Sequence, residues 1–331
     1  MLPLILMMLA IGQHQTKAGA VAEEAAKVLC GFWFEWRPQV DLTMIPKEYN
    51  MICVAFIEDD SIPTFRPRFY SDEYFIEGIK ELKNQGRDVL VSIGGAAGHI
   101  AIKQADKSAF KQELMGVLEK YGFNGVDIDL EGESVRAADN QTVIPEVLRE
   151  IKDHYRAQGR EFVITMAPEF IDLRGEEAPY RPYVDDLEGY YNLIFPQYYN
   201  QGADGIWSHR LGKYLSQNDD EVKADFLYEL THAIVTGTED FIKISHEKFA
   251  MGLPASPQAA KNGYVKNPED VAWALDRLAR EGNPIRGLMT WSINHDSANG
   301  YEFARRYAPM LFSSHTNPQS KGASGGNTQS T

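Results

Sequence analysis

The stretch Phe123-Asn-Gly-Val-Asp-Ile-Asp-Leu-Glu131 decides how the rest of the sequence is interpreted. Side chains alternate between the two faces of a β-strand. One face of this stretch is therefore aliphatic, and the other carries three carboxylates: Asp127, Asp129 and Glu131. Neighbouring side chains on one face start about 7 Å apart at their Cα atoms. Carboxylates this close and partly removed from water cannot all ionise at low cost, so the pattern indicates acid chemistry rather than stability.

Further apolar runs of strand length lie on both sides of this stretch. Most are rich in Val, Ile, Leu and Phe and alternate little, which is typical of parallel strands covered by helices. Together with the carboxylate strand they number eight: 28–34, 51–57, 89–93, 125–131, 162–167, 193–199, 249–254 and 287–293.

Segments with helical periodicity separate these strands. Apolar residues recur at helical spacing over 110–121, 143–155 and 222–234. Asn267-Pro268 followed by two acidic residues is typical of a helix start. Eight strand–helix alternations predict an α/β fold, a (β/α)8 TIM barrel over residues 23–312. The rival is a doubly wound open sheet, but no glycine-rich nucleotide fingerprint follows an early strand.

Composition excludes several classes of protein. The chain has 331 residues, of which 44% are hydrophobic, and 33 basic against 47 acidic residues give a net charge of −14. The apolar content is too high for a disordered chain. The acidic balance disfavours nucleic acid and anionic membranes as partners, and we expect a monomer.

The two ends differ from the body of the chain. Residues 1–22 contain a short apolar run and Ala18-Gly19-Ala20, which together predict a cleaved signal peptide and a secreted protein. A leader unrelated to secretion is the alternative, since the usual basic start is missing. Residues 313–331 are rich in Ser, Gly and Asn and predict a flexible tail.

Cys30 and Cys53 both lie in apolar strands, so buried free thiols are expected, although a single disulfide is left open. Asn140-Gln-Thr142 is a glycosylation sequon, but a helix-start asparagine is the preferred interpretation.

The direction of the carboxylate strand suggests a role for each acid. Glu131 comes last, at the carboxyl end where barrel active sites open. We expect Glu131 to be the general acid, Asp129 to shuttle between Glu131 and the reacting group, and Asp127 to buffer Asp129. The alternatives are a solvated edge strand and a divalent-metal site. Neither is favoured, because the opposite face is apolar and no phosphate loop is visible, so no metal or cofactor is expected.

Four motifs together resemble family 18 of the glycoside hydrolases, the chitinase family. Residues 124–131 are similar to its DxxDxDxE signature, with Asn124 in place of the first Asp. Ser92-Ile-Gly94-Gly95 resembles the SxGG motif, and Gln197-Tyr-Tyr199-Asn200 the QxYN form of the MxYD motif. Trp291 ends the eighth strand, as the family's sugar-stacking tryptophan does. The motifs follow in order across the whole body of the chain.

The resemblance implies retaining, substrate-assisted hydrolysis of N-acetylglucosamine polymers. Glu131 would be the acid, Asp129 would orient the N-acetyl nitrogen, and Tyr199 would donate to the acetyl oxygen. Gln197 and Asn200 would contact the sugar, and Trp291 would form the floor beneath it. Ser92, Gly94 and Gly95 would pack closely under the carboxylate strand, with Ser92 near Asp127.

Further substrate contacts are expected from loops at the same end of the barrel. Trp33 and Trp36 follow the first strand and Trp207 follows the sixth, so these three are candidate sugar platforms. Met166-Ala-Pro-Glu169 ends the fifth strand and resembles a stretch common in bacterial members. Met166 and Glu169 are therefore expected to line the leaving-group side, with an ordinary loop position as the alternative.

The predicted activity is that of a secreted, endo-acting chitinase on chitin or chitooligosaccharides. Residues 255–286 leave no room for the α+β domain that some members insert between strands seven and eight, so we expect an open cleft. The alternatives are an endo-β-N-acetylglucosaminidase acting on N-glycans and a non-catalytic chitin-binding lectin. The presence of Glu131 argues against the lectin.

Overall fold

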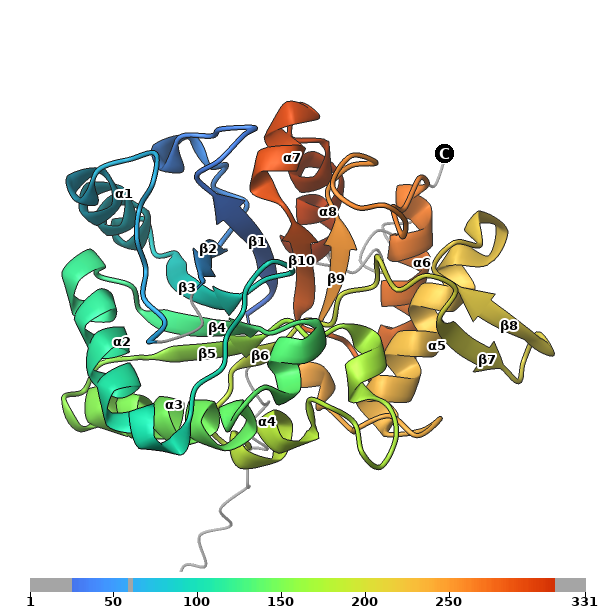
Figure 1. The fold of residues 1–331 in the computed structure, drawn as a ribbon. Helices are drawn as coiled ribbons and strands as arrows, with labels where there is room; N and C mark the ends of the chain where they lie inside the picture. The colour runs from blue at the N-terminus through green and yellow to red at the C-terminus, as the bar shows by residue number, and fades with distance from the viewer. Residues whose placement is uncertain (1–25, 59–61, 313–331) are drawn as a thin grey trace, which may run out of the picture.

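The predicted parallel strands form a closed barrel in the computed structural model, which describes residues 26–58 and 62–312. Eight strands pair in the order β6-β5-β4-β3-β2-β1-β10-β9, and parallel bridges from Ile194 to Phe249 and from Gln197 to Gly252 close the ring (Figure 1). The barrel strands are β1 (Val28–Phe34), β2 (Met51–Ile57), β3 (Asp88–Gly94), β4 (Gly125–Asp129), β5 (Val163–Met166), β6 (Leu193–Ile194), β9 (Ala250–Pro254) and β10 (Gly287–Trp291).

Helices surround the barrel and cover its apolar outer surface (Figure 1). Asn267 precedes the helix predicted to start at Pro268, but its side chain makes no capping hydrogen bond. The helices are α1 (Asp72–Asn84), α2 (Lys107–Tyr121), α3 (Asn140–Ala157), α4 (Arg181–Asp186), α5 (Lys223–Thr236), α6 (Pro268–Arg280), α7 (Ile293–Ala298) and α8 (Glu302–Phe312). Short 3-10 turns occupy Leu42–Met44, Gln104–Asp106, Gly132–Arg136, Phe170–Leu173, Asp220–Val222 and His246–Lys248.

The segment between β9 and β10 contains α6 and short connections, as predicted, and no inserted domain. An unpredicted feature follows β6. Strands β7 (Gly205–Ser208) and β8 (Lys213–Ser216) form an antiparallel hairpin outside the barrel, beside α5 (Figure 1). Trp207 stands on this hairpin, is 44% exposed and does not line the pocket described below.

Each barrel strand divides its side chains between two apolar layers. In β1, Phe32 and Phe34 belong to the barrel interior, whereas Trp33 belongs to the layer between barrel and helices. Trp33 is fully buried, its ring meets Phe75 of α1 edge to face at 5.8 Å, and its Nε1 donates to the Val40 carbonyl at 2.8 Å. The prediction that Trp33 is a sugar platform is therefore wrong, because the alternation of the strand turns this side chain away from the cleft.

The prediction that Met166 lines the leaving-group side is wrong for the same reason. Its neighbour Thr165 points into the barrel, where it donates to Asp127, so Met166 faces outward and is fully buried in the outer layer. It cannot line the leaving-group side of a cleft.

Two polar or reactive groups are enclosed by the fold. Cys30 and Cys53 are free, buried thiols with their sulfur atoms 3.7 Å apart, as the sequence led us to expect. Asn140, at the start of α3, is also fully buried. Its amide donates to the carbonyls of Ile100 and Ser134, and its oxygen accepts from the Ile102 N–H.

The predicted leader (1–22) and the tail (313–331) lie outside the described residues, and secretion stays a prediction. Within 26–58 and 62–312, no helix is both long and apolar enough to cross a bilayer.

Replacing Trp33 tests the packing assignment. We expect Trp33→Ala to lower the free energy of unfolding by about 3–5 kcal/mol, because it empties a large site in the outer core and orphans the Val40 carbonyl. Trp207→Ala is the matched control and should cost less than about 1 kcal/mol, because its ring is exposed. Urea unfolding followed by fluorescence measures both, and equal losses would contradict the assignment.

Candidate active site

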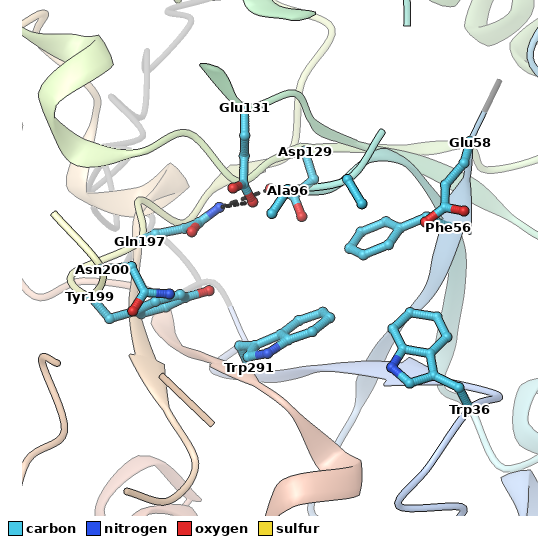
Figure 2. Close-up of a pocket in the computed structure, with 11 residues that line it drawn as sticks. Trp36, Phe56, Glu58, Ala96, Asp129, Glu131, Gln197, Tyr199, Asn200 and Trp291 are labelled. Carbon is cyan, nitrogen blue, oxygen red and sulfur yellow. Dashed lines mark hydrogen bonds between the residues drawn. The ribbon is translucent and has the colours of Figure 1, made fainter. Parts of the chain in front are cut away.

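A pocket of about 210 Å³ opens at the carboxyl ends of the barrel strands. Its walls come from β2, β4 and β10 and from the segments that follow β1, β2, β3, β4 and β6. Figure 2 shows the lining residues, which include both carboxylates expected to act on the substrate. They are Trp36, Phe56, Glu58, Ala96, Ala97, Asp129, Glu131, Gln197, Tyr199, Asn200 and Trp291.

Asp127 lies deepest and is held from both sides. Ser92 of β3 donates to its Oδ2 and Thr165 of β5 to its Oδ1, each at 2.6 Å. Burial raises the pKa of Asp127 to about 6, although the two hydroxyl donors oppose this rise. The predicted approach of Ser92 to Asp127 is thus present. Thr165 was not predicted, although its place on the neighbouring strand could have indicated it.

Asp129 and Glu131 share one hydrogen-bond donor, the side-chain amide of Gln197 (Figure 2). Gln197 Nε2 lies 2.9 Å from Asp129 Oδ1 and 3.1 Å from Glu131 Oε1. The same nitrogen lies 3.0 Å from the Ala167 carbonyl. An amide has two hydrogens for these three acceptors, so one contact is always incompletely satisfied.

Burial is also the main cause of the altered acidity of this pair. It raises the pKa of Glu131 from 4.5 to about 7, with further contributions from the charges of Glu169 and Asp172. Burial and the charges of Glu131 and Asp127 raise the pKa of Asp129 well above its usual range. Glu131 is therefore protonated in part near neutral pH, as a general acid must be.

The SxGG-like turn after β3 lets the backbone approach the carboxylate strand. Gly94 and Gly95 have φ angles of 114° and 79°. A Cβ on Gly94 would lie 2.4 Å from the Asp129 carbonyl oxygen, and a Cβ on Gly95 would lie 2.5 Å from the Phe56 ring. Both positions thus require glycine, because a side chain would clash with these atoms and because the positive φ angles disfavour other residues.

Tyr199 and Asn200 reach the pocket from the segment after β6. The side chain of Tyr199 faces the pocket, whereas Tyr198 points outward and bonds Thr231. Burial and the charge of Asp129 raise the pKa of Tyr199, so its hydroxyl remains a proton donor. Asn200 has a φ of 60°, and its Oδ1 accepts from the Lys261 N–H at 2.8 Å.

Aromatic rings form the floor and one end of the pocket. Trp291 lies across the pocket from Asp129 and Glu131 (Figure 2). The Phe56 ring lies nearly parallel to Trp291, with ring centres 5.8 Å apart, and Trp36 stacks on Phe34 at 4.3 Å. Trp36 and Trp291 are thus placed where a sugar platform could act.

Phe56 and Glu58 are pocket residues that the sequence did not indicate. Strict alternation along β2 would turn Cys53, Ala55 and Ile57 inward. An irregularity between Val54 and Ile57 shifts the register, so Phe56 faces the pocket and Ile57 joins the outer layer. Strand periodicity cannot predict such a bulge.

Glu169 lies near the pocket but does not line it. Its Oε1 accepts from Gln201 Nε2 at 2.8 Å, and its charge contributes to the raised pKa of Glu131. Asp172, three residues further on, is half-buried, and desolvation raises its pKa to about 6. These residues influence the acid electrostatically.

Two alternative interpretations of the carboxylate strand can be compared with the structure. The strand is central, between β3 and β5, and Asp127 and Asp129 are buried, so it is not a solvated edge. Across the described ranges, no group of three His, Cys, Asp or Glu side chains has the arrangement of a metal site. Asn124, which departs from the family motif, bonds the Val89 N–H and Asp88 at the opposite end of the strand.

The raised pKa of Glu131 makes a prediction about stability. A raised carboxyl pKa stabilises the fold fully below about pH 4.5 and loses that contribution as pH rises towards 7. We therefore expect Glu131→Gln to unfold at a temperature several degrees above the parent at pH 8, a gain of about 1–2 kcal/mol, and at nearly the same temperature at pH 4. Calorimetry at both values measures this. Glu133→Gln, on the exposed turn that follows, should show no such difference, and an equal gain in both variants would contradict the prediction.

Comparison with known proteins agrees with this geometry. A chitinase of Enterococcus faecalis (strain ATCC 700802 / V583) is 41% identical over 93% of this chain and 97% of its own length. Four longer bacterial chitinases are 26–29% identical, and the chain covers only 22–62% of their lengths.

Solved structures show the same fold. A family GH18 chitinase from Chromobacterium violaceum matches with a TM-score of 0.74 and 26% identity, over 89% of this chain and 91% of that one. The xylanase and α-amylase inhibitor protein XAIP-II of Scadoxus multiflorus matches with a TM-score of 0.63 and 18% identity, over 85% and 97%. This second likeness concerns the fold alone.

Residues 28–320 match the family described as glycosyl hydrolases family 18, whose DxDxE acids, SxGG turn and QxYN segment the structure brings around one pocket. The chain belongs to glycosyl hydrolase family 18 and is a glycoside hydrolase.

Proposed function

We propose that this enzyme is an endo-acting chitinase, which hydrolyses β-1,4 linkages between N-acetylglucosamine units with retention of configuration. The observation that carries the proposal is the pair Asp129 and Glu131, joined by the Gln197 amide and facing Trp291 across the pocket. The relatives named as chitinases support the choice of substrate.

The first chemical step uses the substrate's own acetamido group. A sugar stacked on Trp291 places its acetyl oxygen for attack on the anomeric carbon. As that C–O bond forms, the glycosidic C–O bond breaks, and Glu131 gives its proton to the leaving oxygen. Asp129 accepts the N–H of the acetamido group, and the Tyr199 hydroxyl donates to its oxygen. The product is a cyclic oxazolinium ion.

The second step returns the enzyme to its starting state. Glu131, now ionised, takes a proton from water while the water oxygen attacks the anomeric carbon and opens the ring. Two inversions at this carbon leave the β configuration. Asp127 keeps negative charge behind Asp129 and so contributes to the raised pKa of Asp129.

Two other functions fit the fold less well. The inhibitor XAIP-II shares the fold, so the barrel alone does not establish catalysis. A lectin, however, has no need for a buried acid with a pKa near 7, which destabilises the fold at neutral pH. An endo-β-N-acetylglucosaminidase would use the same acids, but the row of aromatic rings Trp291, Phe56 and Trp36 favours a long uniform polymer.

Removing the acid tests the chemistry. We expect Glu131→Gln to lower turnover of chitotetraose by at least about 10³-fold, because the leaving oxygen loses its proton donor. Reducing-end release measures turnover, and proton NMR of the first product should show the β anomer. Glu133→Gln is the control and should retain activity.

The same assay separates the substrates. The parent enzyme should cut chitotetraose at least about 100-fold faster, in kcat/KM, than a high-mannose glycopeptide, since only the linear oligomer covers several aromatic platforms. Full turnover by Glu131→Gln or an α product would refute the mechanism, and faster cleavage of the glycopeptide would establish the N-glycan activity instead.

The mode of cutting is tested with a soluble chitin derivative. The structure has α6 where a wall domain would deepen the cleft, so a chain can enter sideways and be cut internally. We expect viscosity to fall steeply while few reducing ends have formed. A steady release of dimers with little change in viscosity would show that the enzyme acts from chain ends.

A further inference from the structure

The pocket continues beyond the catalytic carboxylates to a second end, which Trp36 and Glu58 line (Figure 2). Phe56 connects the two ends. Its ring lies 5.8 Å from Trp291 and 6.4 Å from Trp36. A sugar beside Trp36 would therefore neighbour the sugar over Trp291 along the same chain, but it would take no part in the chemistry.

The carboxylate of Glu58 is fixed at this end by a neighbouring loop. Arg68 Nη2 donates to Glu58 Oε2 at 3.0 Å. The backbone of Arg68 is held in turn, because its N–H and that of Phe69 donate to the buried carboxylate of Glu35 at 2.8–2.9 Å. Arg68 therefore approaches Glu58 from a loop that is itself held in place, and the Glu58 side chain is 27% exposed.

The pocket is lined by acidic side chains and by no basic ones. Among its lining residues, the charged side chains are Glu58, Asp129 and Glu131, and no lysine or arginine is present. Asp129 and Glu131 serve the reacting sugar and its acetamido group, whereas Glu58 has no partner in the chemistry. A neutral N-acetyl group gains little from a second carboxylate, but an ammonium group gains an ion pair and contact with aromatic rings.

We propose that Glu58 recognises a deacetylated sugar, a glucosamine unit beside Trp36 whose ammonium group pairs with the Glu58 carboxylate. This inference rests on the proposed chitinase function. The preferred substrate is then a partly deacetylated chitin chain, in which the sugar over Trp291 stays acetylated because its acetyl oxygen is the nucleophile. The mostly exposed side chain of Arg68 continues to hold the other side of Glu58.

The experiment compares two substrates, fully acetylated chitohexaose and a partly deacetylated chitosan. We expect Glu58→Gln to lower the ratio of kcat/KM on chitosan to kcat/KM on chitohexaose by at least about 5-fold. Glu247→Gln is the matched control for net charge. It is exposed before β9, at the opposite end of the barrel, and should leave the ratio at the parent value.

A second measurement needs no variant. Mass-spectrometric sequencing of the chitosan fragments from the parent enzyme should show glucosamine enriched at one fixed position relative to the cleaved bond, and high salt should reduce the enrichment. An unchanged ratio in Glu58→Gln, or glucosamine at random at every position near the cut, would overturn the inference. Failure of the parent to cleave chitohexaose would instead overturn the proposed function.

Discussion

Three carboxylates on one strand must be kept inside a barrel that withholds water from them. Each ionised carboxylate loses hydration there, and each repels the next. The barrel compensates with donors from three other strands or their ends, namely Ser92, Thr165 and Gln197. These hydrogen bonds join β3, β5 and the segment after β6 to β4. The register of these strands is therefore the one that brings the donors within reach of the carboxylates.

The compensation is incomplete, and catalysis uses what is left. Asp127 receives two hydroxyl donors, whereas Asp129 and Glu131 compete for one amide. Glu131, the acid nearest the substrate, has only this shared donor, and burial raises its pKa so that it keeps its proton in part near neutral pH. The shortage of hydrogen-bond donors lowers stability, and it also leaves a proton available for bond cleavage. This explains why the buried polar groups are concentrated at the site, whereas the outer layer is almost wholly apolar.

The sequence predicted the barrel and its acids because both depend on local patterns. All eight strands lie within or close to their predicted bounds, and alternation correctly placed Asp127, Asp129 and Glu131 on one face. Trp33 was misplaced because a tryptophan suits a sugar platform, and Met166 because its stretch resembles one in bacterial relatives. In both cases only the phase of the strand shows that the side chain points outward. Phe56 and Glu58 were missed because a bulge reverses the phase of β2. The β7–β8 hairpin lies outside the eight-stranded barrel, so recognising the barrel in the sequence does not predict it.

Asn140 has a consequence for how the protein is made. Its side chain is wholly buried. The amide nitrogen donates to the carbonyls of Ile100 and Ser134, and the amide oxygen accepts from the Ile102 N–H. It is also the acceptor residue of an Asn-Gln-Thr sequon. Oligosaccharyltransferase modifies nascent chains before they fold, and a glycan at this position would have no room in the finished barrel. A eukaryotic secretory host would therefore divide the nascent chains between glycosylated ones that fail quality control and unmodified ones that fold, and removing the sequon at Thr142 would spare that loss.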